Sequence, residues 1–249
     1  MTKEPRVVWL LRRADDALVL GHRLSEWCGH APMLEEDLAL ANIALDQIGL
    51  ARALYQEVGA ALGRDEDQLA YLRGERDYLN LLIVEQPNGD FARTIVRQLL
   101  YSAVMAPFWR LASSSTDAAI AAVAAKAEKE AAYHLRHAAE WTVRLGDGTD
   151  ESRRRTEAAL DWLWRFTDEM FADDDVERAM VADGAAPDLA SVRGEWERTV
   201  GNVLARATLA RPEPGFPRSG GRQGRHGEEL GHMLAEMQHL QRAYPGATW

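Results

Sequence analysis

Cysteine is almost absent from this sequence, and its absence removes several classes of site. Cys28 is the only cysteine among 249 residues, so the chain has no intrachain disulfide. It cannot by itself build a cysteine-rich zinc site or an iron–sulfur cluster. The apolar run before Arg12 and Arg13 is too short for a secretory signal. Because a chain without disulfides suits a reducing compartment, we expect a cytoplasmic protein.

Long apolar runs and an excess of positive charge are missing as well. The longest aliphatic run, Leu79 to Val84, is interrupted by Asn80 and is much too short to span a membrane. The formal net charge is −10, whereas binding of a nucleic-acid backbone depends on a basic surface that releases counterions. We therefore expect neither a membrane nor a nucleic acid as a partner.

Glycine and proline occur in separate clusters, and Ala, Leu, Glu, Arg and Gln fill the stretches between them. This pattern is typical of long helices joined by short breaks. The sequence predicts an all-α fold in a single domain over 1–249, with a four-helix bundle core and additional flanking helices. Asp117 is expected to cap one of the long helices. The helices are expected at about 13–28, 34–60, 66–83, 91–111, 117–145, 152–171, 188–208 and 227–243.

The longest irregular segment is a connector at about 211–227, with the sequence RPEPGFPRSGGRQGRHG. Its mixture of proline, glycine and polar residues favours a flexible connector. The alternative is a loop that grips an anion, because Arg218, Arg222 and Arg225 could contact a CoA phosphate or the acidic groups of a partner. The spacing matches no phosphate-binding P-loop.

The stretch KEAAYHLRHAAEW has the composition of a helix that binds a carboxylate-bridged di-iron centre, but its spacing fails. Such a centre takes a carboxylate from each of two helices and Glu-x-x-His from each of the other two. Here Ala131 stands three residues before His134. On the inward stripe of the helix expected at 34–60, Gln47 and Leu50 occupy the places of Glu and His. We therefore expect degenerate di-iron positions and no bound metal.

The remaining ligand candidates are isolated. The helix expected at 91–111 contains no Asp or Glu, and Glu26 alone anchors no di-iron centre, whether it is buried and paired or exposed. A lone inward histidine such as His134 is more often a hydrogen-bonded core residue than a ligand, and Glu130 can pair with Lys126. Nucleophile-elbow, dinucleotide, Walker and zinc-helix motifs are absent from the sequence, so we expect no catalytic residue.

Two further features indicate surface that faces outward. One true Glu-x-x-His is present, from Glu236 to His239, but both side chains project away from the apolar stripe of their helix. Solvent or a partner is therefore favoured there over a metal. Trp162 and Trp164 lie two positions apart on one helix and cannot share a narrow stripe, so at least one is expected to face a partner.

A set of longer stretches carries a resemblance to a known family. In chain order they are RLSEWCGHAP, LALANIALDQIGLAR, LLIVEQPNGDFARTI, KEAAYHLRHAAEW, LWRFTDEMF and LAEMQHLQR. Together they resemble the C-subunit family of the multicomponent phenylacetyl-CoA epoxidase, or ring 1,2-phenylacetyl-CoA monooxygenase, of bacterial phenylacetate degradation. The resemblance spans nearly the whole chain, and EWCGHAP and VEQPNG are its most specific motifs.

The resemblance implies a ferritin-like fold and a non-catalytic role beside a catalytic A subunit in a hetero-oligomeric complex. It implies that the A subunit has a di-iron site, with a His-Ser-Glu where this chain has Leu24, Ser25 and Glu26. It further implies Glu-x-x-His motifs where this chain has Gln47-x-x-Leu50 and Ala131-x-x-His134. Electrons would come from NADPH through a separate reductase, and this chain would hold no cofactor.

Two functions follow as expectations. The preferred one is a structural subunit that supports the catalytic subunit in epoxidising the aromatic ring of phenylacetyl-CoA. The alternative is a free-standing ferritin-like, iron-dependent oxidase that holds one iron through Glu26, Glu130 and His134. Metal content distinguishes these two functions.

Overall fold

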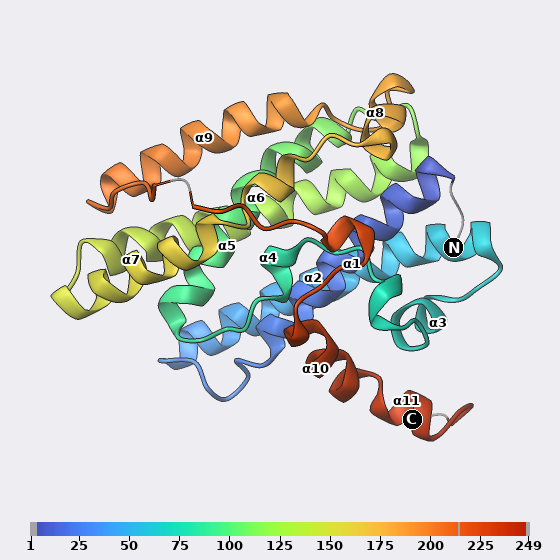
Figure 1. Cartoon of the computed structure of the whole chain (residues 1–249), viewed down its shortest axis with the longest axis horizontal. Coiled ribbons are helices and arrows are strands. Elements are labelled where there is room, and N and C mark those ends of the chain that lie inside the picture. The colour runs from blue at the N-terminus through green and yellow to red at the C-terminus, as the bar shows by residue number, and fades with distance from the viewer. Residues whose placement is uncertain (1–3, 214, 248–249) are drawn as a thin grey trace.

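The computed structural model describes residues 4–213 and 215–247, and helices are the only regular elements within these ranges (Figure 1). The all-α prediction is therefore confirmed. The domain expected over 1–249 and the connector expected at 211–227 each include positions outside the described residues. The longest helices are α1 (Pro5–Ser25), α2 (Leu34–Leu62), α5 (Phe91–Ala112) and α6 (Ala118–Gly146).

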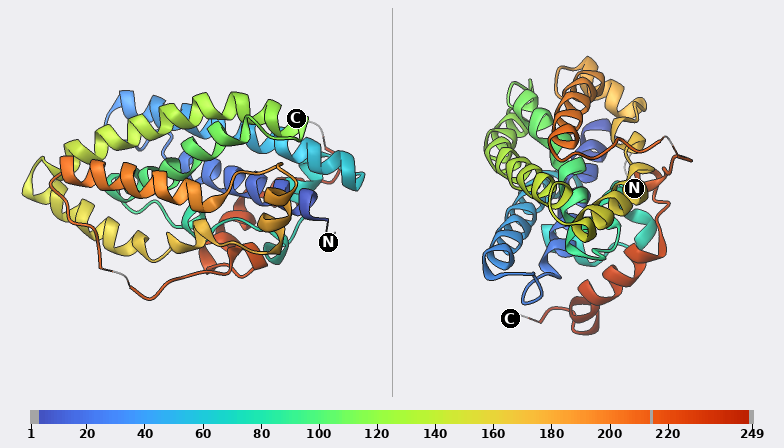
Figure 2. Two further views of the ribbon diagram at one scale, coloured as in Figure 1. Left: turned by 90° about the horizontal axis from the view of Figure 1, so that it is seen from above. Right: turned by 90° about the vertical axis from the view of Figure 1, so that its left-hand side faces the viewer.

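The four longest helices form two pairs, and the other helices flank them. α1 packs along α2, α5 packs along α6, and α2 also meets α6 (Figure 2). The pairs are joined in the core, where Trp9 of α1 stacks on Phe108 of α5 with 5.8 Å between ring centroids. The flanking helices are α3 (Glu66–Tyr71), α4 (Leu82–Glu85), α7 (Asp150–Trp164), α8 (Asp175–Ala182), α9 (Leu189–Arg206), α10 (Glu228–Met237) and α11 (His239–Ala243). No helix within the described residues has the length and apolar character needed to cross a membrane.

α1 is buried along almost its whole length and carries charged residues into the interior. Its apolar side chains surround the helix axis, which is typical of a central helix. Asp15 is fully buried and pairs with Arg73, which follows α3. Asp16, equally buried, pairs with Arg222, with 2.7 Å between Nη2 and Oδ2. Each carboxylate thereby fastens a distant connecting segment to the central helix.

The helix expected at 66–83 is wrong in its second half, because buried carboxylates take the backbone donors that a helix would use internally. α3 ends at Tyr71. Beyond it, the N–H of Leu79 donates to Asp15 and the N–H of Leu81 donates to Asp16, each at 2.7 Å. These acceptors are remote in sequence, so helical propensity could not reveal the competition.

Other helix boundaries also depart from the sequence prediction. α1 begins at Pro5, where proline suits the first turn of a helix, and not near position 13. The helix expected at 227–243 divides at Gln238, whose buried amide donates to the carbonyl of Arg73 at 3.1 Å. α8 was not expected. Asp117 does cap α6, as predicted, by accepting a hydrogen bond from the N–H of Ala119 at 3.0 Å.

The described part of the connector is anchored at its C-terminal end, which corrects the expectation of a flexible segment. The N–H groups of Gly220 and Gly221 each donate to the buried carboxylate of Glu169 at 2.8 Å. Gly221 also approaches the carbonyl of Asn80 so closely that a Cβ would lie 2.0 Å from its oxygen. Glycine is therefore required there, because any side chain would displace the chain from the core.

Candidate functional site

Four of the five degenerate di-iron positions lie at one small cavity between α2, α5 and α6. Gln47 and Leu50 of α2 and Ala131 and His134 of α6 all line it, so the structure brings together the residues singled out by spacing. Its volume is about 10 Å³, which is close to the minimum that holds one water molecule. Met105 and Trp109 of α5 also line it.

His134 is a hydrogen-bonded core residue, as the sequence favoured. Its side chain is 2% exposed, and its Nε2 lies 3.0 Å from Oδ2 of Asp46 on α2. The amide Nε2 of Gln47 lies 3.4 Å from Nδ1 of the same ring. An amide donating to Nδ1 and a carboxylate accepting from Nε2 require the neutral imidazole with its proton on Nε2. Burial lowers the pKa of His134, although Asp46 acts in the opposite direction.

The donor set around the cavity does not fit a di-iron centre. Leu50 and Ala131 offer no ligand atom, and α5 contributes Ser102 and Met105, whereas di-iron centres need bridging carboxylates. Glu130 also lines the cavity, but its carboxylate lies 3.4 Å from Nζ of Lys126, as expected. Within residues 4–213 and 215–247, no three His, Cys, Asp or Glu side chains gather as a metal site would require.

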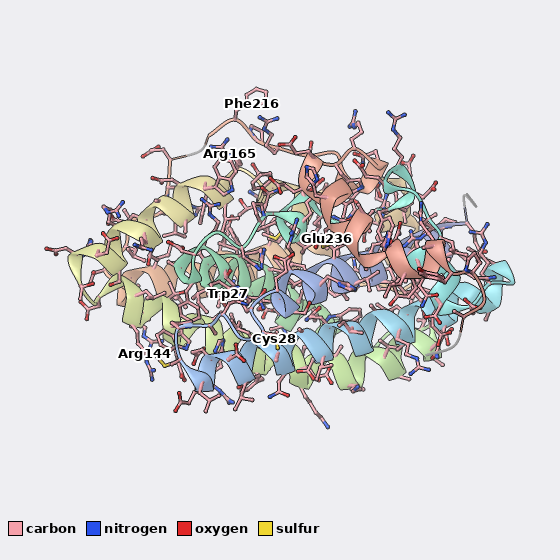
Figure 3. All side chains as sticks on the ribbon, turned by 90° about the horizontal axis from the view of Figure 1, so that it is seen from below. Trp27, Cys28, Arg144, Arg165, Phe216 and Glu236 are labelled. Carbon is pink, nitrogen blue, oxygen red and sulfur yellow. The ribbon has the colours of Figure 1, made fainter. Side chains whose placement is uncertain are left out.

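Glu26 is separate from this cavity. Its exposed carboxylate pairs with Arg23, with 2.7 Å between Oε1 and Nη1, and accepts from Nδ2 of Asn88 at 2.8 Å. Of the three residues considered as ligands of a single iron, only Glu130 and His134 therefore lie at one place. Glu236 and His239 are both exposed, which agrees with the outward direction predicted for them. Glu236 is labelled in Figure 3.

Two carboxylate–histidine pairs join α2 to α6, and sequence spacing missed both acids. Besides Asp46 with His134, Oε2 of Glu36 lies 2.8 Å from Nε2 of His137. The side chains of His137 and Glu36 are both largely buried. Acids at these positions of α2 resemble ordinary solvated charges in the sequence, so only the helix packing reveals their partners.

The three arginines of the connector have different environments. Arg222 is buried, and its guanidinium donates to Asp16 and to the carbonyl of Leu79 at 2.8 Å. This guanidinium is used inside the fold and is not presented to a phosphate or a partner. Arg218 and Arg225 are exposed and line a groove. The sequence could not separate them, because all three follow glycine or proline in an irregular segment.

Comparison with known proteins adds an independent line of evidence. A sequence model of the family described as "Phenylacetic acid catabolic protein" matches residues 1–249. The chain is also 48% identical over 242 residues to the C subunit of 1,2-phenylacetyl-CoA epoxidase from Escherichia coli (strain K12). That alignment covers 97% of this chain and 98% of the relative.

Proposed function

Because this chain belongs to the phenylacetic acid catabolic protein family, whose fold is ferritin-like, we propose that it is a structural, non-catalytic subunit of a phenylacetyl-CoA epoxidase complex. Its role is to support the catalytic A subunit in aerobic phenylacetate catabolism. The A subunit holds the di-iron centre and epoxidises the aromatic ring of phenylacetyl-CoA. NADPH supplies electrons through a separate reductase, and this chain holds neither cofactor.

One observation carries the proposal: the helix-bundle position that a metal centre would need is closed by core packing. Leu50 and Ala131 stand at two ligand positions, and the cavity between them has a volume of about 10 Å³. His134 is neutral, buried and already bonded to Asp46 and Gln47. Side chains that fill this centre keep the four helices packed but provide no ligands for a metal, as expected of a supporting subunit.

A docking surface for the catalytic subunit is available on α2. Leu34, Leu38 and Leu45 project from this helix and are 71%, 56% and 65% exposed. On neighbouring α6, Tyr133 is also exposed. We call these four residues the α2 leucine surface. Large apolar side chains gathered on adjoining helices mark protein–protein interfaces, because covering them removes apolar area from water. We assign this surface to the A subunit.

The test combines metal analysis with co-purification. The chain is purified alone after iron loading, and in parallel it is co-expressed with the catalytic subunit and analysed on a sizing column. We expect no stoichiometric iron in the isolated chain, co-elution of the two subunits, and epoxidase activity only when both are present. Stoichiometric iron with oxygen consumption by the isolated chain would establish the oxidase alternative and overturn the structural role.

A further inference from the structure

A second concave site lies outside the α2–α6 cavity. It is a groove of about 740 Å³ between α4, the end of α7 and the segment that leads into α10. Small-molecule sites typically have volumes of roughly 300–1,000 Å³. Leu82, Pro87, Trp162 and Phe166 supply an apolar wall. Trp162 remains 39% exposed, so part of this wall is available to a ligand.

Three arginines line the groove, and no carboxylate within the described residues pairs with them. The backbone N–H of Arg218 donates to the carbonyl of Arg165 at 2.8 Å, so these two residues lie side by side on neighbouring segments of the chain. The guanidinium of Arg165 lies 5.0 Å from the ring centroid of Trp162. The guanidinium of Arg225 donates a hydrogen bond to the neutral amide of Gln223, at 3.5 Å. Figure 3 shows Arg165 toward the edge of the molecule along which the segment carrying Phe216 runs.

Three carboxylates also line the groove, but none of them forms an ion pair with these arginines. Glu85 is buried and already faces His226, with 2.8 Å between Oε2 and Nδ1. Glu228 and Glu229 lie in the first turn of α10, where the helix N-terminus itself favours negative charge. The three guanidinium groups therefore have no carboxylate partner within the described residues and are available to an anionic ligand.

We propose that this groove binds an organic phosphate. Guanidinium groups of Arg165, Arg218 and Arg225 take the phosphate oxygens, because the planar fork of arginine matches phosphate geometry. The apolar wall beside Trp162 covers the organic part of the ligand. A concave site with an aromatic wall favours a small molecule over the acidic segment of a protein. The inference does not depend on the structural role proposed above, since it concerns the isolated chain.

The experiment measures binding of defined phosphates to the full chain by titration calorimetry at low salt. The probes are inorganic pyrophosphate, CoA and dephospho-CoA, so that phosphate recognition is separated from recognition of the organic part. We expect one saturable site that prefers CoA to pyrophosphate. The double variant R165Q/R218Q should weaken CoA binding about tenfold or more, because two charged groups that hydrogen-bond the phosphate oxygens are lost.

Matched controls make the outcome decisive. Arg154 is an exposed arginine of α7 that pairs with Glu151 and does not line the groove, so R154Q should bind CoA as the wild type does. W162F should weaken CoA more than pyrophosphate. Undetectable binding of all three probes at millimolar concentration would overturn the proposal, as would binding that R165Q/R218Q leaves unchanged. Loss of the catalytic subunit from R165Q/R218Q with unchanged CoA binding would identify a protein contact and equally overturn it.

Discussion

His226 and Glu85 form a buried pair that holds the start of α10 against α4. Nδ1 of His226 lies 2.8 Å from Oε2 of Glu85, and Nε2 lies 2.8 Å from the carbonyl oxygen of Tyr78. Both partners are acceptors, so the ring satisfies both only as a doubly protonated imidazolium. The α10 attachment therefore depends on a proton at His226.

The first prediction concerns pH. Burial lowers the pKa of His226, but Glu85, the carbonyl of Tyr78 and Asp15 together raise it, and the folded pKa lies above the unfolded value of 6.5. A raised folded pKa means that the stabilisation is complete below pH 6.5 and is lost as pH rises through the folded value. We expect the urea midpoint to fall across that window in the wild type. H226Q should lack this pH-dependent fall of the urea midpoint. An identical pH profile in both proteins would contradict the prediction.

The second prediction separates two arginines of the same segment. Arg222 is buried against Asp16, and removing one partner of a buried ion pair leaves the other charge uncompensated. R222A should lower the free energy of unfolding by about 3–5 kcal/mol. R218A is the matched control, because Arg218 is exposed, and it should change stability by less than about 0.5 kcal/mol. Chemical denaturation measures both values, and equal effects would refute the assignment of Arg222 to the interior.

The third prediction tests how tightly the degenerate centre is packed. Ala131 lines the cavity of about 10 Å³, whereas Ala132, the next residue on α6, is exposed. Leucine at position 131 has no room, so A131L should destabilise the protein by roughly 1–3 kcal/mol. A132L should be nearly neutral. Thermal unfolding compares them, and a neutral A131L would mean that the centre can open.

The fourth prediction tests the α2 leucine surface. L38E/L45E places charge on two exposed positions and should leave the unfolding temperature nearly unchanged. The same variant should abolish co-elution with the catalytic subunit, because an unpaired carboxylate would be buried at the interface. L72E alters a leucine that is also exposed but lies just after α3, and it should retain co-elution. Retained assembly by L38E/L45E would place the catalytic subunit elsewhere on this chain.

Much of the fold follows from local chemistry and could be predicted from the sequence. Helical periodicity located α2, α5 and α6, and Asp117 caps α6 because a side-chain oxygen satisfies N–H groups within its own turn. The same periodicity placed Gln47 and His134 on inward faces, where the structure finds them. The outward direction predicted for Glu236 is likewise correct, and of the two tryptophans of which at least one was expected to face outward, Trp162 is exposed and Trp164 is buried. Each of these properties depends on residues a few positions apart.

Only the tertiary structure decided which charged residues are buried and which residues pair with them. The sequence alone established an all-helical chain whose inward positions lack the ligands of a metal centre. It could not show that Asp15 and Asp16 accept hydrogen bonds from the backbone of Leu79 and Leu81, or that Arg222 enters the core while Arg218 stays exposed. A buried charge is stable only beside its partner, and the partner here comes from a remote part of the chain. Local sequence patterns do not predict such pairs, because only folding brings the two residues together.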